Sequence, residues 1–284
     1  MPNTPTKRSR RDRYDASFVP PAFGLNALFP YLMKGRNESF ALFPMTIDME
    51  PLLAYIAAKK GTDQEISLFE SFMLALVKVL RQSPSLNRYI IGRRMYQRRN
   101  VVLSFIARKK YVDNSQETNV LVSIKPDDDR ATILSKLRGE IRVAKAEDAP
   151  PKDDDKLIGE FLKLPRGLLR VFIKLLEWWD FYRDTPKFLR GVDPLRGSAY
   201  IANVGSVGLD AAYHHMFEWG TCSLFVVIGK VEPKVMVGQG NVPVVKQAVN
   251  VKVTLDERIA DGYIDAKALT LLETYLADPA QLEW

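Results

Sequence analysis

The sequence predicts an α+β fold in which a mixed β-sheet carries helices on one face. Strand-like apolar runs and long helical patterns are mixed in the first half, and antiparallel-looking hairpins dominate the second half. The chain has 284 residues, enough for one large domain or two small ones, and shows no internal repeat. Hydrophobic residues make up 46% and charged residues 26%, which is ordinary for a soluble globular protein.

The N-terminal residues 1–29 form a basic segment that we predict to be a disordered arm preceding a core of residues 30–284. The net charge is +7, and the stretch KRSRRDR at residues 7–13 contributes four of these charges. A solubilising tail is the preferred interpretation. Contact with an acidic partner, a nucleic acid or a membrane surface is the alternative.

The elements that follow have clear local signals. Residues 38–48 are rich in aromatic and apolar side chains and predict a strand, and residues 49–61 predict a helix. A second helix is predicted over residues 66–84, where Ser67 and Glu70 have the spacing of a capping box. Its nearly unbroken apolar pattern indicates a helix that is buried on most of its surface.

Residues 88–110 predict a hairpin followed by a strand with alternating apolar side chains. A strand at 119–126, a solvated helix at 129–147 and a linker at 148–156 come next. Basic side chains gather around the hairpin, namely Arg88, Arg93, Arg94, Arg98, Arg99, Arg108, Lys109 and Lys110.

The block 157–190 differs from its surroundings. Apolar residues recur in it at helical spacing, and Arg166, Arg170 and Lys174 fall on one basic stripe. Packing on the protein's own core or on another subunit is the first interpretation. A helix lying on a membrane surface is the second, because Trp178 and Trp179 combine a large apolar body with a polar tip.

The C-terminal half completes the pattern. Strands predicted within 198–206 and 222–232 flank a loop that contains His214 and His215, and a hairpin at 234–256 leads to a final helix at 263–279. Cys222 is the only cysteine, which excludes an internal disulfide and a multi-cysteine metal site.

The location predicted from the sequence is cytoplasmic. The N-terminus lacks the apolar segment of a secretory signal, and no uninterrupted apolar run approaches the roughly 20 residues of a membrane-spanning helix.

Four motifs occur in one order along residues 30–276. A strand ends in an acidic residue within FALFPMTIDMEPLLAY, a helix closes in Pro84, Leu86 and Asn87, and the segment AYIANVGSVGLD precedes the loop LDERIADG. Together they resemble the acyltransferase core of the 2-oxo acid dehydrogenase complexes, and more distantly chloramphenicol acetyltransferase.

The resemblance implies a chloramphenicol acetyltransferase-like fold and a homotrimer, which larger assemblies can extend. It places the active site in a channel between subunits, where coenzyme A or an acyl-CoA reacts with an acyl acceptor or donor. It implies no metal. A covalently bound lipoate is not expected, because only about 30 residues precede the core and no lipoyl-lysine hairpin is visible. The block 157–190 is an insertion relative to the family.

Two chemical groups of the family are missing at their expected positions. Glu257 stands where the resemblance implies a general-base histidine, and Ala202 stands where it implies an oxyanion-binding hydroxyl. The loop scaffold is retained in Asp256, Arg258, Asp261 and Gly262. The resemblance implies that Asp261 forms a structural ion pair, with Arg36 or Lys34 as its partner.

A relocated site is one hypothesis for the missing groups. Glu257 paired with His214 or His215 would form a base, and Ser206 would supply a hydroxyl. A subunit contact lined by the two histidines is the preferred alternative.

Three functions are therefore compared. The first is a free-standing acyltransferase, in which Arg93, Arg94, Arg98 and Arg99 bind the phosphates of coenzyme A or are simply solvated. The second is an inactive trimeric scaffold or an acyl-CoA or thioester binder. Nucleic-acid binding is the third, and it is not expected because no recognised module is present.

Overall fold

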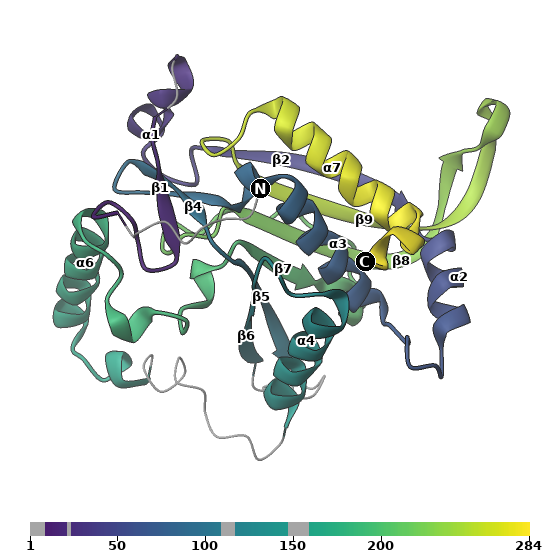
Figure 1. Cartoon of the computed structure of the whole chain (residues 1–284), viewed down its shortest axis with the longest axis horizontal. Helices are drawn as coiled ribbons and strands as arrows, with labels where there is room; N and C mark the ends of the chain where they lie inside the picture. The colour runs from purple at the N-terminus through teal and green to yellow at the C-terminus, as the bar shows by residue number, and fades with distance from the viewer. Residues whose placement is uncertain (1–8, 22–23, 109–116, 147–158) are drawn as a thin grey trace.

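A computed structural model describes residues 9–21, 24–108, 117–146 and 159–284 (Figure 1). The predicted linker at 148–156, as well as Lys109 and Lys110, lies outside these residues. Among the described residues, no helix is long and apolar enough to cross a membrane.

A six-stranded mixed sheet forms the centre of the molecule. Its order is β2-β9-β8-β7-β5-β6, and β7 runs parallel to both of its neighbours while the other pairs are antiparallel. The strands are β2 (Phe40–Asp48), β5 (Val101–Arg108), β6 (Glu117–Ile124), β7 (Ala199–Asn203), β8 (Leu224–Val237) and β9 (Pro243–Asp256). This arrangement confirms the predicted fold class.

Helices cover one face of this sheet (Figure 1). They are α2 (Glu50–Lys59), α3 (Leu68–Gln82), α4 (Arg130–Lys145) and α7 (Gly262–Ala277). The predicted capping box starts α3, since Ser67 Oγ accepts from the backbone N–H of Glu70 while the Glu70 carboxylate accepts from that of Ser67. Ten of the residues of α3 are buried, as its apolar pattern predicts.

A second, three-stranded sheet contradicts the prediction of a disordered N-terminal arm. It has the order β1-β4-β3 and contains β1 (Ala16–Val19), β3 (Arg88–Ile91) and β4 (Arg94–Arg98). Residues 16–19 add to the hairpin as a strand. Arg13 is only 4% exposed, and its buried charge is compensated by the ion pair with Asp180. The short helix α1 (Phe29–Leu32) follows. Residues 1–8 and 22–23 lie outside the described part.

Helix α6 (Arg166–Tyr182) lies at the left of the molecule in Figure 1, apart from the four helices on the sheet. Only Leu176 and Asp180 of this helix are buried. Asp180 accepts from Arg13 Nη1 and from Arg196 Nη2, each at 2.9 Å. A buried carboxylate between two arginines, rather than an extensive apolar contact, therefore holds α6.

Beyond the sheet, β8 and β9 continue as a two-stranded hairpin that projects at the right of Figure 1. Several of its valines are largely exposed: Val235, Val237, Val242 and Val245.

Candidate active site

The loop between β9 and α7 is held by a buried ion pair. Asp256 is 1% exposed and accepts from Arg258 Nε at 2.8 Å and from Arg258 Nη2 at 2.7 Å. The backbone N–H of Glu257 donates to the carbonyl of Ser39 at 2.9 Å. These contacts fix the backbone on both sides of Glu257 and leave its side chain exposed.

Asp261 has a different role from the predicted one. Its carboxylate accepts from the backbone N–H of Ile264 at 3.0 Å and so caps the N-terminus of α7, which begins at Gly262. No ion pair joins Asp261 to any other described residue. Arg36, the expected partner, is buried and donates instead to the carbonyls of Glu218 and Ile90.

Glu257 lines a cavity of about 300 Å³, called here the Glu257 cavity. Four arginines share its wall, namely Arg88, Arg93, Arg94 and Arg258. Apolar side chains from the N-terminal segment, such as Phe18 and Phe29, line the rest. The cavity thus places an exposed carboxylate among several positive charges and beside an apolar surface.

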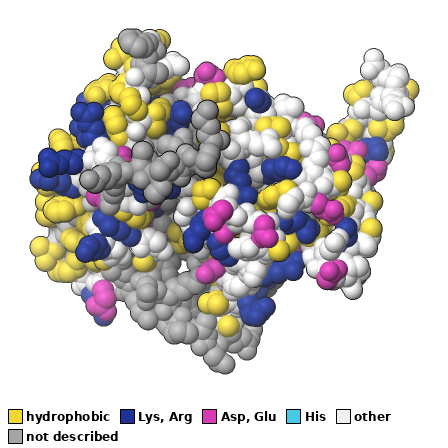
Figure 2. All heavy atoms as spheres, in the orientation of Figure 1, with side chains coloured by type: hydrophobic (Ala, Val, Ile, Leu, Met, Phe, Trp, Pro, Cys, Tyr) yellow, Lys and Arg dark blue, Asp and Glu magenta, His cyan; other side chains and the backbone are white. Residues whose placement is uncertain are grey.

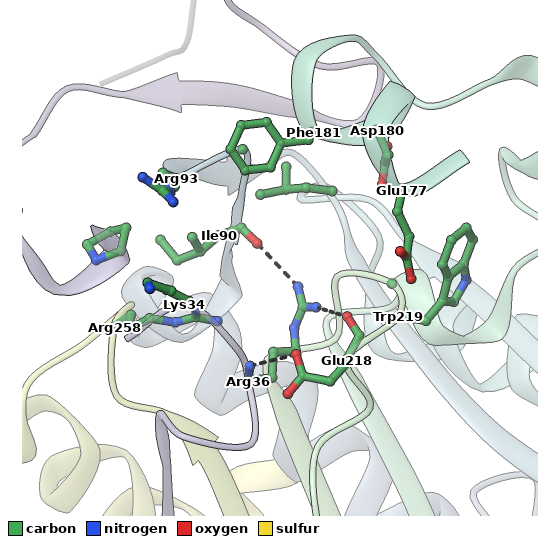
Figure 3. A pocket seen from close by; sticks show the side chains of 14 residues that line it. Lys34, Arg36, Ile90, Arg93, Glu177, Asp180, Phe181, Glu218, Trp219 and Arg258 are labelled. Atoms are coloured by element: carbon green, nitrogen blue, oxygen red, sulfur yellow. Dashed lines mark hydrogen bonds between the residues drawn. The ribbon is translucent and has the colours of Figure 1, made fainter. Parts of the chain in front are cut away.

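A second cavity of about 330 Å³, called here the Arg36 cavity, adjoins the first, since Pro30, Arg93 and Arg258 line both (Figure 3). Polar groups from separated elements surround it: Lys34, Arg36, Glu177 and Glu218. The side chain of Arg258, next to Glu257 in the loop, therefore contributes to the wall of both cavities.

The hairpin turn between β3 and β4 places the arginines of the Glu257 cavity. Gly92 and Arg93 have φ angles of 59° and 58°, as a tight two-residue turn requires. The guanidinium of Arg93 lies 5.6 Å from the centre of the Tyr31 ring, a cation–π distance. Arg93 and Arg94 are both exposed, so their charges are accessible to a ligand.

Arg98 and Arg99, which we predicted to bind coenzyme A together with Arg93 and Arg94, line neither the Glu257 cavity nor the Arg36 cavity and make structural contacts. Arg98 is 4% exposed and donates to Asp15 at 2.6 Å and to backbone carbonyls, including that of Gly197. Arg99 donates to three carbonyls of the N-terminal segment, those of Arg13, Tyr14 and Ala16. Both side chains tie residues 13–16 to the rest of the fold.

The predicted relocated base is not formed within the chain. His214 stacks on Phe225 at 4.0 Å between ring centres, and also on His215 at 4.8 Å. Each histidine Nδ1 contacts the backbone carbonyl of the next residue. Neither ring lines the Glu257 cavity or the Arg36 cavity.

Ser206 is also directed elsewhere. Its hydroxyl donates to the carbonyl of Asn203 at 2.7 Å and so closes a local turn. Ala202, at the position of the expected oxyanion donor, lies in β7 opposite Val227 and packs against the apolar cluster around Tyr200 and Phe225. Ser206 lines neither of the two cavities.

Asp265 interacts electrostatically with Glu257 and Asp261 of the Glu257 cavity, and we did not predict this from the sequence. It lies in the first turn of α7, is 3% exposed, and its Oδ1 has no hydrogen-bond partner among the residues that the structure describes. Burial, reinforced by the charges of Asp261 and Glu257, raises the pKa of Asp265 to about 6. Three carboxyl groups therefore interact electrostatically at the N-terminus of α7.

We predict that Asp265→Asn stabilises the protein in a pH-dependent way. Because the folded-state pKa lies above the unfolded value of about 3.9, the protonated carboxyl favours folding at low pH, and this contribution is lost as pH rises through 6. The variant should gain about 2 kcal/mol at pH 8 and nothing at pH 4. Urea unfolding at both pH values tests this, with the exposed Glu273→Gln on the same helix as control. An equal gain at both pH values would contradict the prediction.

The side chains of the described residues include no group of three or more His, Cys, Asp or Glu that could hold a metal ion.

Comparisons with known proteins identify the fold. No family model matches the sequence, and no curated protein matches it significantly. Among solved structures, the dihydrolipoamide acetyltransferase of Azotobacter vinelandii has a TM-score of 0.55 at 14% identity, covering 99% of both chains. The cubic core of a pyruvate dehydrogenase multienzyme complex has a TM-score of 0.52 at 13% identity, again over 99% of both chains. A chloramphenicol acetyltransferase has a TM-score of 0.53 at 11% identity, covering 93% of this chain and 98% of its own.

These neighbours show that the chain has the chloramphenicol acetyltransferase-like fold, in the form shared with the acyltransferase cores of 2-oxo acid dehydrogenase complexes. The resemblance found in the sequence motifs is confirmed at the level of the fold.

Proposed function

We propose that this protein is a coenzyme A-dependent acyltransferase with a non-standard active site, in which Glu257 takes the position of the base. The observation that carries the proposal is the exposed Glu257 carboxylate in a cavity walled by four arginines, on a loop fixed by the Asp256–Arg258 ion pair. The chemistry would be attack of a thiol or hydroxyl on an acyl thioester, with Glu257 accepting the proton.

The arginines of the Glu257 cavity would help a carboxylate to serve in place of a histidine, because they would lower the pKa of a bound thiol. A free thiol has a pKa near 8.5, and nearby positive charge lowers the pKa of a thiol. Arg93 and Arg94, exposed at the mouth of the cavity, would stabilise a thiolate and so reduce the demand on the base. The same guanidinium groups suit the phosphates of coenzyme A, which guanidinium binds in a bidentate manner.

A homotrimer is part of this proposal, as is a location in the cytoplasm. The structural neighbours include a multienzyme core that is described as cubic. The exposed valines of the β8–β9 hairpin offer an apolar contact for another copy of the chain. Sedimentation velocity would measure the assembly state directly.

A binding protein without turnover is the second candidate. It is favoured by the position of His214, which stacks on Phe225 and does not line the Glu257 cavity, and by Ala202, which has no hydroxyl. For comparison, the study of the Azotobacter enzyme concerns a serine, a histidine and an asparagine in that protein's mechanism. In this second candidate function, the Glu257 cavity binds a thioester but does not catalyse acyl transfer.

Glu257→Gln separates the two candidates. We expect calorimetry with acetyl-CoA to show binding to both proteins, and a thiol-release assay to show turnover that falls by about a hundredfold or more in the variant. Asp127→Asn, an exposed carboxylate outside both cavities, is the matched control and should leave turnover unchanged.

Each other outcome has a definite meaning. Binding of acetyl-CoA without turnover by the unaltered protein would favour the binding protein. Turnover that survives Glu257→Gln would remove Glu257 as the base. Absence of binding by the unaltered protein would contradict both candidates.

A further inference from the structure

Helix α6 presents three distinct faces. Its inner face contains the buried Leu176 and Asp180, together with the partly buried Leu169, Phe172 and Ile173. The other two faces point to solvent, one apolar and one basic. Neither is needed for the active-site chemistry proposed above.

The apolar outer face is unusually exposed. Its residues follow one another at intervals of three or four positions, and each has more than half of its surface exposed: Leu168, Val171, Leu175, Trp178 and Tyr182. Scattered exposed leucines are common in soluble proteins, whereas a continuous stripe of this kind marks an interaction surface.

The basic face borders this stripe. Arg166, Arg170 and Lys174 are exposed at four-residue intervals, and none of them forms an ion pair with another described residue. Lys174 lies one helical turn from Trp178, so the two rows adjoin. Of the acidic residues of the helix, Asp180 is buried. Glu177 lines the Arg36 cavity and is exposed three positions from Lys174, so the basic face carries three cations and one carboxylate.

The orientation of α6 is fixed, so the apolar stripe cannot turn inward. Asp180 is held by Arg13 and Arg196. A Cβ atom on Gly92 would lie 2.2 Å from the carbonyl oxygen of Phe181, which shows how closely the β3–β4 turn approaches the helix. At the left of Figure 2, hydrophobic and basic side chains adjoin on the molecular surface where Figure 1 places α6.

We propose that α6 docks on the surface of an anionic lipid membrane. The leucines, Val171 and the aromatic rings would enter the boundary between headgroups and acyl chains, where Trp and Tyr are favoured because one end is apolar and the other polar. The row Arg166, Arg170 and Lys174 would contact lipid phosphates. Together with Glu177 the row keeps an excess of positive charge, which an anionic lipid surface would neutralise, whereas pairing two copies of α6 would add a second basic row.

Flotation with lipid vesicles tests whether the basic row contacts anionic lipids. The full chain should float with vesicles of phosphatidylcholine and phosphatidylglycerol, should remain behind with pure phosphatidylcholine, and should be released by added salt. Neutralising the row as Arg166→Gln, Arg170→Gln and Lys174→Gln should weaken binding by about a hundredfold. The exposed basic residues of other helices provide a matched control that should retain binding: Arg142→Gln, Lys145→Gln and Lys267→Gln.

The role of the apolar stripe in membrane binding is tested with a second variant and a matched control. Leu175→Ser with Trp178→Ser should abolish flotation, and Ile106→Ser with Val143→Ser, at exposed positions elsewhere, should not. All four positions are exposed, so the variants should keep the circular dichroism of the folded protein. The proposal is overturned if the unaltered protein does not float with anionic vesicles, or if both α6 variants float normally. It is also overturned if Leu175→Ser with Trp178→Ser dissociates an oligomer in sedimentation velocity and leaves flotation unchanged, because the face would then be a contact between copies.

Discussion

Replacing Asp180 by alanine is expected to destabilise the protein by about 3–5 kcal/mol. Arg13 and Arg196 are 4% and 5% exposed, and both direct guanidinium nitrogens at this carboxylate. Arg13 would lose its carboxylate partner and remain a buried, unpaired charge. Arg196 would keep its ion pair with Asp193 at 3.1 Å. Most of the loss of stability should therefore come from the unpaired charge of Arg13.

The same substitution should also release α6 locally. Asp180 is one of only two buried residues of the helix, and its carboxylate also accepts from the hydroxyl of Thr185 at 3.1 Å. Urea unfolding measures the global loss, and limited proteolysis within residues 166–182 measures the local one. Cleavage there should become faster in Asp180→Ala at urea concentrations that leave the core folded.

Two further variants check the cause. Glu160→Ala breaks the exposed ion pair with Lys163 and should cost less than about 1 kcal/mol. Arg13→Met combined with Asp180→Leu removes one buried charge together with its partner and should recover part of the loss, because well-packed apolar groups can replace a buried pair. If Asp180→Ala costs no more than Glu160→Ala, the buried ion pairs do not hold α6.

Local sequence signals predicted the secondary structure and the fold class. The capping box at Ser67 and Glu70 and the apolar run after it predicted a helix over 66–84, and α3 spans Leu68–Gln82. These signals act within a few residues, so they can be read before the tertiary structure is known. The order of the four motifs then identified the shared fold.

The roles of the basic residues were mostly not predictable. Arg13 and Arg98 lie in charge-rich stretches that suggest solvated side chains, yet their carboxylate partners are 167 and 83 residues distant in the sequence. Such pairings are set by tertiary structure alone. Arg93 and Arg94 differ because a Gly-Arg turn places them at an exposed hairpin end, which local sequence does indicate.

Asp265 could have been recognised from helical periodicity. It precedes Ala268 and Leu272 by three and seven positions, and both of those residues are buried on the sheet-facing side of α7. That spacing places the carboxyl on the inner face of the helix.

By contrast, the position of His214 outside the Glu257 cavity could not be predicted. Its ring stacks on Phe225 of β8, a contact that no local sequence pattern reveals.

Replacing Asp256 by alanine is expected to cost about 3–5 kcal/mol and to disable the candidate site. Arg258 is 5% exposed and would lose both hydrogen bonds to the carboxylate, retaining only that to the carbonyl of Met33 at 3.1 Å. The oxygens of Asp256 also accept from the Ser39 hydroxyl, and Ser39 in turn holds the backbone of Glu257. The loop should therefore become less rigid, and so should the part of the wall of both cavities that Arg258 forms.

The two effects can be measured separately. Urea unfolding gives the stability, and calorimetry with acetyl-CoA at low temperature, where the variant remains folded, gives the affinity of the site. Glu232→Ala breaks partly exposed ion pairs with Lys230 and Lys234 on β8. As the control, it should lower the stability only slightly and leave acetyl-CoA binding unchanged. Asp256→Leu with Arg258→Leu removes both buried charges, and should regain stability without regaining acetyl-CoA binding, since Arg258 lines both cavities. Restored binding in that double variant would mean that the ligand does not use the wall formed by Arg258, and the proposed site would have to lie elsewhere in the molecule.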